Sequence, residues 1–396
     1  MKKIIFILLG TISILNLYAQ KQVEKPQLIL PGHSNDLNAV AFSLKFNVLA
    51  STGWDNSINI YSGDSTFKLI KSIPNAHRAQ INALKFSKQG NMLVSASNDF
   101  VVNVYDSTFK KTKMLVAADG HTANISSVIF DNSGRVVFSA DDAGRIILWS
   151  LETQKKIKEL NNGVTVNAIA MSSDPRTLFV AGKEPFVKVM NAANGKIQRT
   201  FDGHTDAINA LEISPNQKYL LTGSNDKSAR IWDLKTGKEL RKLSVDCWKV
   251  TAVAFSFDSK YCATGCNDGT IKIWDVETGN LIESISPQGF NTRDLVFLKR
   301  YRQLAVAPML KGGSDFGVRI YPTELIDPIT QSETLANALP VNKFQNAIDS
   351  LIKIRPLTKQ DSLKFQLIKK GIDNKMKPMV NKTDSVRIYK TPSKNR

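Results

Sequence analysis

Short stretches in which apolar and polar residues alternate recur along most of the chain. Three of them, 37–43, 81–87 and 208–214, share the order of apolar and polar positions. Such alternation places every second side chain on one face, which is typical of a half-buried β-strand. Each is followed by a second apolar stretch, a polar turn with an aspartate, and a third stretch ending in an aromatic residue. A further turn, which is Lys-Thr-Gly at 235–237 and Glu-Thr-Gly at 277–279, then precedes a fourth apolar stretch. Each repeat therefore predicts four strands.

The aromatic position that ends the third predicted strand gives the number of repeats. It is occupied by Tyr61, Tyr105, Trp149, Met190, Trp232, Trp274 and Tyr321. The successive spacings are 44, 44, 41, 42, 42 and 47 residues. A self-similar period of roughly 40–45 residues is typical of a β-propeller, with one repeat per blade. The spacing favours seven blades, with six or eight as the alternatives.

Two further motifs carry a resemblance to a known family. Gly-His pairs stand at 32–33, 120–121 and 203–204, Ala-His stands at 76–77, and Trp-Asp stands at 232–233 and 274–275. With this spacing the sequence resembles the WD-repeat family. The resemblance implies an all-β, seven-bladed propeller of four-stranded blades over residues 22–325. The fourth and seventh repeats depart from the pattern, because both lack the histidine and the fourth carries Met190.

The two ends of the repeat region predict how the ring closes. Residues 25–30 look like a fourth strand without its own first three, while the seventh repeat has no clear fourth strand after Tyr321. Pairing these segments completes the last blade and removes open strand edges, which otherwise invite aggregation.

All four histidines occupy the repeat position, and the resemblance implies a structural role for them. In the family this histidine bonds a strand Ser or Thr and the turn Asp, and the hydroxyl also bonds the Trp indole. The matching residues here are His33, Ser51, Asp55, His77, Ser95, Asp99, His121, Ser139, Asp142, His204, Thr222, Asp226, Trp232, Asp268 and Trp274. In the third repeat we take Asp142 as the acid, on the view that one residue is inserted before Trp149.

This assignment argues against catalysis. A neutral imidazole has one donor and one acceptor, so an aspartate and a hydroxyl satisfy both. A hydrolase triad would be needed once beside an open pocket, whereas this set recurs from blade to blade. No histidine pair remains for zinc, and no Gly-rich phosphate loop is present. Asp141 and Asp142 occupy the turn of their repeat, and a structural role there is the favoured interpretation. An acid–base pair formed by the two is the less favoured alternative. We therefore expect that the protein is not an enzyme and that it needs no cofactor.

Aromatic residues outside the repeat positions are the candidate partner-binding residues. They are Trp54, Phe100, Trp248 and Phe290, next to the turns or on the approach to a first strand. Exposed aromatics anchor protein interfaces, and the alternative is that each packs under a neighbouring loop. Trp54, Trp248 and Phe290 belong to blades that become adjacent on closure, so one patch is a hypothesis. Neighbouring polar candidates are Asp36, Asn124, Asp206 and Lys249.

The first residues resemble a secretory signal. Lys2 and Lys3 precede an apolar run, and Ala19 offers a small residue at the cleavage position. We expect residues 1–19 to be removed and the protein to be secreted or periplasmic, with an uncleaved anchor as the alternative. No later stretch is long and apolar enough for a transmembrane segment.

The chain has three cysteines, so a disulfide between any two of them leaves the third as a free thiol. Cys262 and Cys266 lie four residues apart in one predicted strand, roughly 13 Å, which is too far for a disulfide. We interpret the cysteines as small buried hydrophobes, and leave open whether Cys247 pairs.

The formal net charge of +18 is concentrated near the end of the chain. Residues 326–396 hold 14 Lys/Arg against six Asp/Glu and lack the repeat pattern. Apolar spacing predicts two short helices before Gly371 and a Lys-rich flexible tail after it. A solvated basic tail, a partner-binding extension, and weak contact with envelope polymers or lipid remain open. Nucleic acid is disfavoured, because no stacking aromatics interleave with the basic residues.

Together these observations predict a non-catalytic scaffold that binds one or more proteins through one propeller face. The alternatives are a propeller hydrolase, or an ion or small-ligand sensor that uses the central channel.

Overall fold

The computed structural model describes residues 25–287, 289–298, 303–323 and 325. The chain divides into two compact units, residues 1–324 and 325–396, and every described residue except Leu325 belongs to the first. The predicted signal segment 1–19 and the predicted helices and tail within 326–396 lie outside the described residues. Within these ranges no helix has the length and apolar character needed to cross a membrane.

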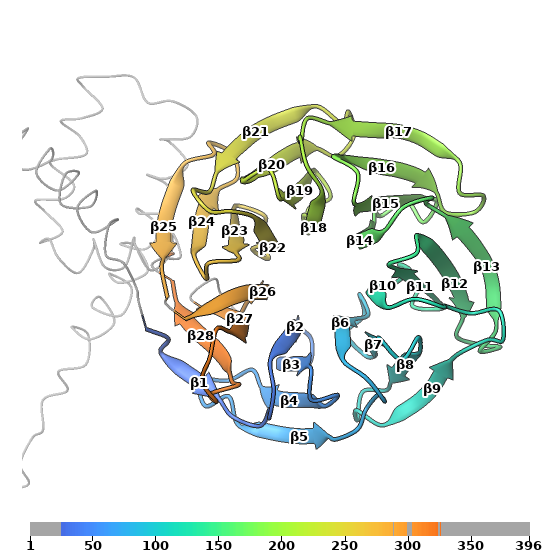
Figure 1. Ribbon diagram of the computed structural model, residues 1–396, viewed down its shortest axis with the longest axis horizontal. Helices are drawn as coiled ribbons and strands as arrows, with labels where there is room; N and C mark the ends of the chain where they lie inside the picture. Colours follow the sequence, from blue (N-terminus) through green and yellow to red (C-terminus); the bar gives the residue numbers. More distant parts are fainter. Residues whose placement is uncertain (1–24, 288, 299–302, 324, 326–396) are drawn as a thin grey trace, which may run out of the picture. The chain divides into compact units, whose positions relative to one another are not determined.

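The first unit is a ring of seven antiparallel four-stranded sheets, which confirms the predicted seven-bladed propeller (Figure 1). Alternating sequence forms half-buried strands, and each blade runs outward from an inner strand beside the channel. Blade 1 comprises β2 Leu37–Ser43, β3 Val48–Gly53, β4 Ile58–Ser62 and β5 Leu69–Ile73. Blade 2 comprises β6 Ile81–Phe86, β7 Leu93–Ser97, β8 Val102–Tyr105 and β9 Lys111–Leu115. Blade 3 comprises β10 Ile125–Phe130, β11 Val136–Asp141, β12 Arg145–Ser150 and β13 Lys156–Asn161.

The degenerate fourth repeat forms a complete blade like the others. Blade 4 comprises β14 Val166–Met171, β15 Thr177–Gly182, β16 Phe186–Asn191 and β17 Ile197–Asp202. Blade 5 comprises β18 Ile208–Ile213, β19 Tyr219–Ser224, β20 Ser228–Asp233 and β21 Glu239–Ser244. Blade 6 comprises β22 Val250–Phe255, β23 Tyr261–Cys266, β24 Ile271–Asp275 and β25 Leu281–Ile285.

Blade 7 joins the two ends of the repeat region, as the sequence predicted. Its strands are β26 Phe290–Phe297, β27 Gln303–Leu310 and β28 Val318–Pro322, with β1 Leu28–Leu30 as the fourth. Leu28 pairs with Ile320 and Leu30 with Val318, antiparallel. The ring is therefore closed by main-chain hydrogen bonds between residues that are about 290 positions apart in sequence.

The hydrophobic core consists of layers between neighbouring blades. One layer joins blades 5 and 6 through Leu221, Leu243 and Trp274. Another joins blade 7 to blade 1 through Leu30, Leu49 and Ile320. Because each sheet buries both faces against its neighbours, no blade completes its core alone.

A ring of polar side chains at the channel wall links each blade to the next. The residue that follows the first inner-strand position donates to a main-chain carbonyl near the start of the next blade's inner strand; the acceptor is the first residue of that strand in blades 2 to 6 and the third, Thr292, in blade 7. The donors are Asn38 to Ile81, Asn82 to Ile125, Ser126 to Val166, Asn167 to Ile208, Asn209 to Val250 and Thr251 to Thr292. Arg293 of blade 7 completes the circle by donating to the Asn38 side-chain oxygen, 3.5 Å away.

Candidate functional site

The histidine network is formed in the four blades that carry the repeat histidine. In blade 5, His204 Nδ1 lies 2.7 Å from Asp226 Oδ2, and His204 Nε2 lies 2.7 Å from Thr222 Oγ1. The Trp232 indole N–H donates to the same hydroxyl at 2.9 Å. The network ties the loop before the inner strand to the turn between the second and third strands. We call the propeller face that carries these loops and turns the entry face.

The carboxylate decides the tautomer of the histidine. An ionised carboxylate can only accept, so His204 Nδ1 carries a proton and donates it to Asp226. In the neutral ring Nε2 has no proton and accepts from the Thr222 hydroxyl, which itself accepts from the Trp232 indole. Burial lowers the pKa of His204, and the bond to Asp226 opposes this only in part, which favours the neutral ring.

Blades 1 and 2 repeat the arrangement with tyrosine in place of tryptophan. His33 bonds Asp55 at 2.8 Å and Ser51 at 2.7 Å. His77 bonds Asp99 at 3.0 Å and Ser95 at 2.7 Å. Burial alone would raise the pKa of Asp99, but the bonds from His77 and the Arg78 main chain lower it to about 2.

In blade 3 the acid is Asp141, so the prediction of Asp142 was wrong. His121 Nδ1 lies 2.7 Å from Asp141 Oδ2, and Ser139 bonds both the imidazole and the Trp149 indole. His121 and Trp149 are as far apart in sequence as His204 and Trp232, so no residue is inserted. Asp141 is the last residue of β11. Its carboxylate reaches the His121 imidazole from a position two residues earlier than that of the turn aspartate in the other three blades. Asp142 is exposed, and Asp141 is not free to act with it as an acid–base pair.

Blades 4, 6 and 7 have no histidine. A cation on the third strand instead contacts the entry loop in blades 4 and 6, and the first residue of the inner strand in blade 7. Lys188 donates to the Asn162 carbonyl at 3.0 Å. Lys272 forms an ion pair with Asp246 at 2.6 Å. Arg319 lies over the Phe290 ring, 4.8 Å from its centroid. In blade 6, Trp274 bonds Thr264, which the sequence analysis did not single out, and Asp268 accepts the Thr270 N–H.

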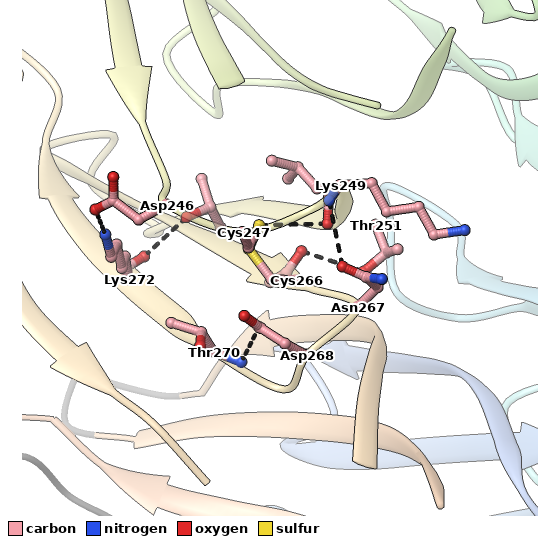
Figure 2. The surroundings of a disulfide bond; sticks show 12 residues. Asp246, Cys247, Lys249, Thr251, Cys266, Asn267, Asp268, Thr270 and Lys272 are labelled. Carbon is pink, nitrogen blue, oxygen red and sulfur yellow. Dashed lines mark hydrogen bonds and ion pairs between the residues drawn. A yellow bond between two sulfur atoms is a disulfide. The ribbon is translucent and has the colours of Figure 1, made fainter. Parts of the chain in front are cut away.

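Blade 6 also contains a disulfide, which corrects the interpretation of the cysteines as simple hydrophobes. Cys247 and Cys266 are joined, with their Cα atoms 6.3 Å apart, whereas Cys262 is buried and free (Figure 2). Cys266 has the register position of Ser224 in blade 5, whose hydroxyl holds the entry loop there. The disulfide therefore replaces a hydrogen bond with a covalent link. Closing a loop of this size adds about 3 kcal/mol of stability in the chain-entropy model.

The candidate partner-binding aromatics differ widely in exposure. Trp248 is 75% exposed and Phe100 is 40% exposed on the entry face. Phe290 is 1% exposed, so its prediction as an exposed anchor was wrong: it packs beneath Arg319. Trp54 is half-buried, and its indole donates to Asn38 of the polar ring at 3.1 Å. Phe290 is thus no member of the hypothetical three-residue patch.

The polar candidates take mostly structural positions at the entry face. Asp36 accepts the Leu310 N–H at 2.8 Å, which links blade 1 to blade 7. Asp206 caps the Ala207 N–H of its own loop. Asn124 and Lys249 line a hollow of about 410 Å³ at this end of the channel, together with Asp142 and Arg293. Partial desolvation of Asp142 in this hollow raises its pKa, and the neighbouring Asp141 charge adds to the effect.

The family of the chain follows from its repeats. The model of the "WD domain, G-beta repeat" matches residues 24–62, 67–106, 112–150, 195–233 and 237–275. The chain belongs to the WD-repeat family. The matches fall on repeats one, two, three, five and six, and the structure supplies the other two WD-repeat blades. A search of curated proteins gave no match.

WD-repeat propellers are commonly protein-interaction scaffolds and are typically not enzymes. Among the described residues, no group of three or more His, Cys, Asp or Glu side chains is placed to hold a metal ion. All four histidines are held in structural bonds to a carboxylate and a hydroxyl.

The channel holds a charged group that sequence reasoning missed. Glu212 of β18 and Asp294 of β26 line a hollow of about 760 Å³ with Lys85 of β6. Burial raises the pKa of Glu212 to about 7, Lys85 opposes the rise, and the Asp294 charge adds to it. Burial also raises the pKa of Asp294. In the sequence these residues stand alone on alternating strands, so only ring closure brings them together.

Replacing Thr222 by valine should destabilise the protein by about 2–4 kcal/mol. The side-chain shape is kept, but His204 Nε2 and the Trp232 indole both lose a buried partner. Chemical denaturation measures the change. Thr236→Val, in an exposed turn of the same blade, is the matched control and should cost less than about 1 kcal/mol. Equal effects of the two substitutions would contradict the network's structural role.

Replacing Glu212 by glutamine should stabilise the protein at high pH. Because the folded-state pKa is raised, Glu212 favours folding at low pH and this contribution is lost as pH rises from about 4.5 through about 7. Glutamine carries no charge and keeps an acceptor for the Phe255 N–H. We expect a gain of about 1–3 kcal/mol at pH 8.5 and almost none at pH 4.5. Denaturation of both proteins at the two pH values checks this, and a gain independent of pH would refute it.

Proposed function

We propose that this protein is a non-catalytic scaffold outside the cytoplasm, in the periplasm or the extracellular space, and that it binds a partner protein through its entry face. The observation that carries the proposal is Trp248, which is 75% exposed. A soluble fold gains nothing by leaving an indole in water, and tryptophan is enriched among the residues that dominate interface energies.

The surroundings of Trp248 support its role as an anchor. Cys247, which directly precedes it, is tied to β23 by the disulfide, so the loop is held before a partner arrives (Figure 2). A preorganised anchor costs less conformational entropy on binding than a mobile one. Lys227 lies 5.0 Å from the Trp248 ring centroid, and Lys249 is exposed beside it. An acidic partner surface would complement this charge.

The disulfide and the start of the chain support a location outside the cytoplasm. Structural disulfides persist in oxidising compartments and are rare in reducing ones. The pattern of Lys2, Lys3, the apolar run and Ala19 is that of a cleaved signal peptide. Two independent features therefore favour the same setting.

The assignment of the imidazoles supports a function without catalysis. Each nitrogen lies within hydrogen-bond distance of a side chain of its own blade, as set out above for His33, His77, His121 and His204. A catalytic base needs a free nitrogen facing a substrate pocket. Acid–base chemistry by Asp and Glu side chains in the channel would likewise require a bound substrate.

Replacing Trp248 by alanine should reduce partner recovery at least tenfold in affinity capture from the native envelope. The change removes an exposed side chain, so stability should stay within about 0.5 kcal/mol. Ile157→Ala is the matched control, since Ile157 is a 55% exposed apolar residue on the outer strand β13. Partners that survive Trp248→Ala as well as Ile157→Ala would remove the entry face from the proposal.

Thiol counting tests the oxidised state in cells. Quenched and denatured protein should react with maleimide–polyethylene glycol at Cys262 alone, and after reduction at all three cysteines. Three reactive thiols without reduction would place the native protein in a reducing compartment and contradict the proposed location.

A further inference from the structure

The channel widens at the end opposite the entry face. The hollow of about 760 Å³ is lined by inner-strand residues of all seven blades and by turns between first and second strands, among them 43–45 and 87–90. We call this end the hairpin face. Its volume falls within the range of roughly 300–1,000 Å³ that is usual for small-molecule sites.

Three blades place a charge in the wall where most others place alanine. The first residues after the register shift of the inner strand are Ala39, Ala83, Ser127, Ala168, Ala210, Ala252 and Asp294. Two residues further on they are Ala41, Lys85, Ile129, Ala170, Glu212, Ala254 and Val296. The other blades carry uncharged residues at these two positions, so closure of the ring does not require the charges.

The lysines and the carboxylates that line the hollow lie on different blades. Lys45, Lys85 and Lys88 lie on blades 1 and 2, whereas Glu212 and Asp294 lie on blades 5 and 7. Arg293 of blade 7 also lines the hollow, and its guanidinium donates to the Asn38 side chain. Figure 1 shows β6 and β18 on different sides of the channel. Among the described ion pairs none joins Lys85 to either carboxylate.

One carboxylate oxygen and the lysine keep unused hydrogen-bonding capacity. Glu212 Oε2 accepts the Phe255 N–H at 2.9 Å, but within the described part of the chain Oε1 has no partner. Asp294 accepts the Val40 and Leu295 N–H groups. The carboxylates are thus held in place by the main chain and face the hollow with negative charge. Burial destabilises the ionised form of both side chains, as the raised pKa values of Glu212 and Asp294 indicate.

Part of the remaining wall is apolar and aromatic, and amide and hydroxyl side chains line the rest. Phe42 and Phe257 lie with ring centroids 6.1 Å apart, and Phe86 and Phe255 also line the hollow. Apolar surface with a few fixed polar groups is the usual composition of a ligand site. A ligand that fits all three features carries a cation, an anion and an apolar body between them.

We propose that the hairpin face binds the free termini of a short apolar peptide of about two to four residues. The ammonium lies toward Glu212 and Asp294, the carboxylate toward Lys85 and Lys88, and the apolar side chains against the phenylalanines. This site is at the opposite end of the channel from Trp248 and does not depend on the proposed scaffold function.

Calorimetry with the full chain and the tripeptide leucyl-phenylalanyl-leucine tests the proposal. We expect saturable binding, at least tenfold weaker for the N-acetylated form and for the C-terminal amide. Phenethylamine, an apolar amine without a carboxylate, should also bind at least tenfold more weakly. Trp248→Ala should leave the affinity unchanged, so failure of this proposal and failure of the scaffold proposal are distinguishable.

Two substitutions test which charged side chain binds which end of the peptide. Glu212→Gln should weaken binding of the free tripeptide at least fivefold and leave the affinity of its N-acetylated form unchanged. Lys85→Gln should weaken binding of the free tripeptide at least fivefold, because it removes the partner of the carboxylate. It should leave the affinity of the C-terminal amide unchanged. Lys111→Gln, on the outer strand β9, is the matched control and should bind as the wild type does. Thermal melting confirms that each variant is folded.

The proposal is overturned by any of four results. The first is absence of tripeptide binding at millimolar concentration. The second is equal affinity for the free and blocked forms, and the third is unchanged affinity in folded Glu212→Gln and Lys85→Gln variants. Binding of phenethylamine as tight as that of the tripeptide would also overturn it, because the carboxylate would then contribute nothing.

Discussion

The architecture depends on closure of the ring. No blade buries both of its faces alone, so each needs the next, and the last needs the first. The pairing of β1 with β28 supplies the main-chain link, and the polar ring supplies one side-chain link between successive blades. Arg293 completes that circle through Asn38, to which the Trp54 indole also donates. Trp54 is therefore partly committed to closure, whereas Trp248 is 75% exposed and takes no part in the polar ring.

The blades solve one local problem in three ways. The loop entering each inner strand must be held against the blade, because a buried polar group left unpaired costs about 1–3 kcal/mol. Four blades use a histidine between a hydroxyl and a carboxylate. Blades 4, 6 and 7 use a cation on the third strand, and blade 6 adds a disulfide. The blade with the covalent solution is also the one that presents the most exposed tryptophan.

The two ends of the channel differ in chemistry. The entry-face hollow is lined by amides, hydroxyls and a few charges, most of them spent in bonds between blades. The hairpin-face hollow is larger, partly aromatic, and holds Lys85, Glu212 and Asp294 without an ion pair between them. A scaffold surface and a small-ligand site can therefore occupy opposite ends of the same fold without competing.

The sequence by itself determined the repeat, the blade number, the closing strand and most of the histidine network, because these follow from local periodicity and fixed spacing. It placed the blade 3 acid at Asp142, since spacing cannot show that the end of β11 brings Asp141 closer to His121. The disulfide needed the register of β22 against β23, which brings Cys247 and Cys266 together across 19 positions. The burial of Phe290 and the meeting of Lys85, Glu212 and Asp294 were decided by tertiary structure alone, because contacts between blades depend on how the ring closes and not on any one repeat.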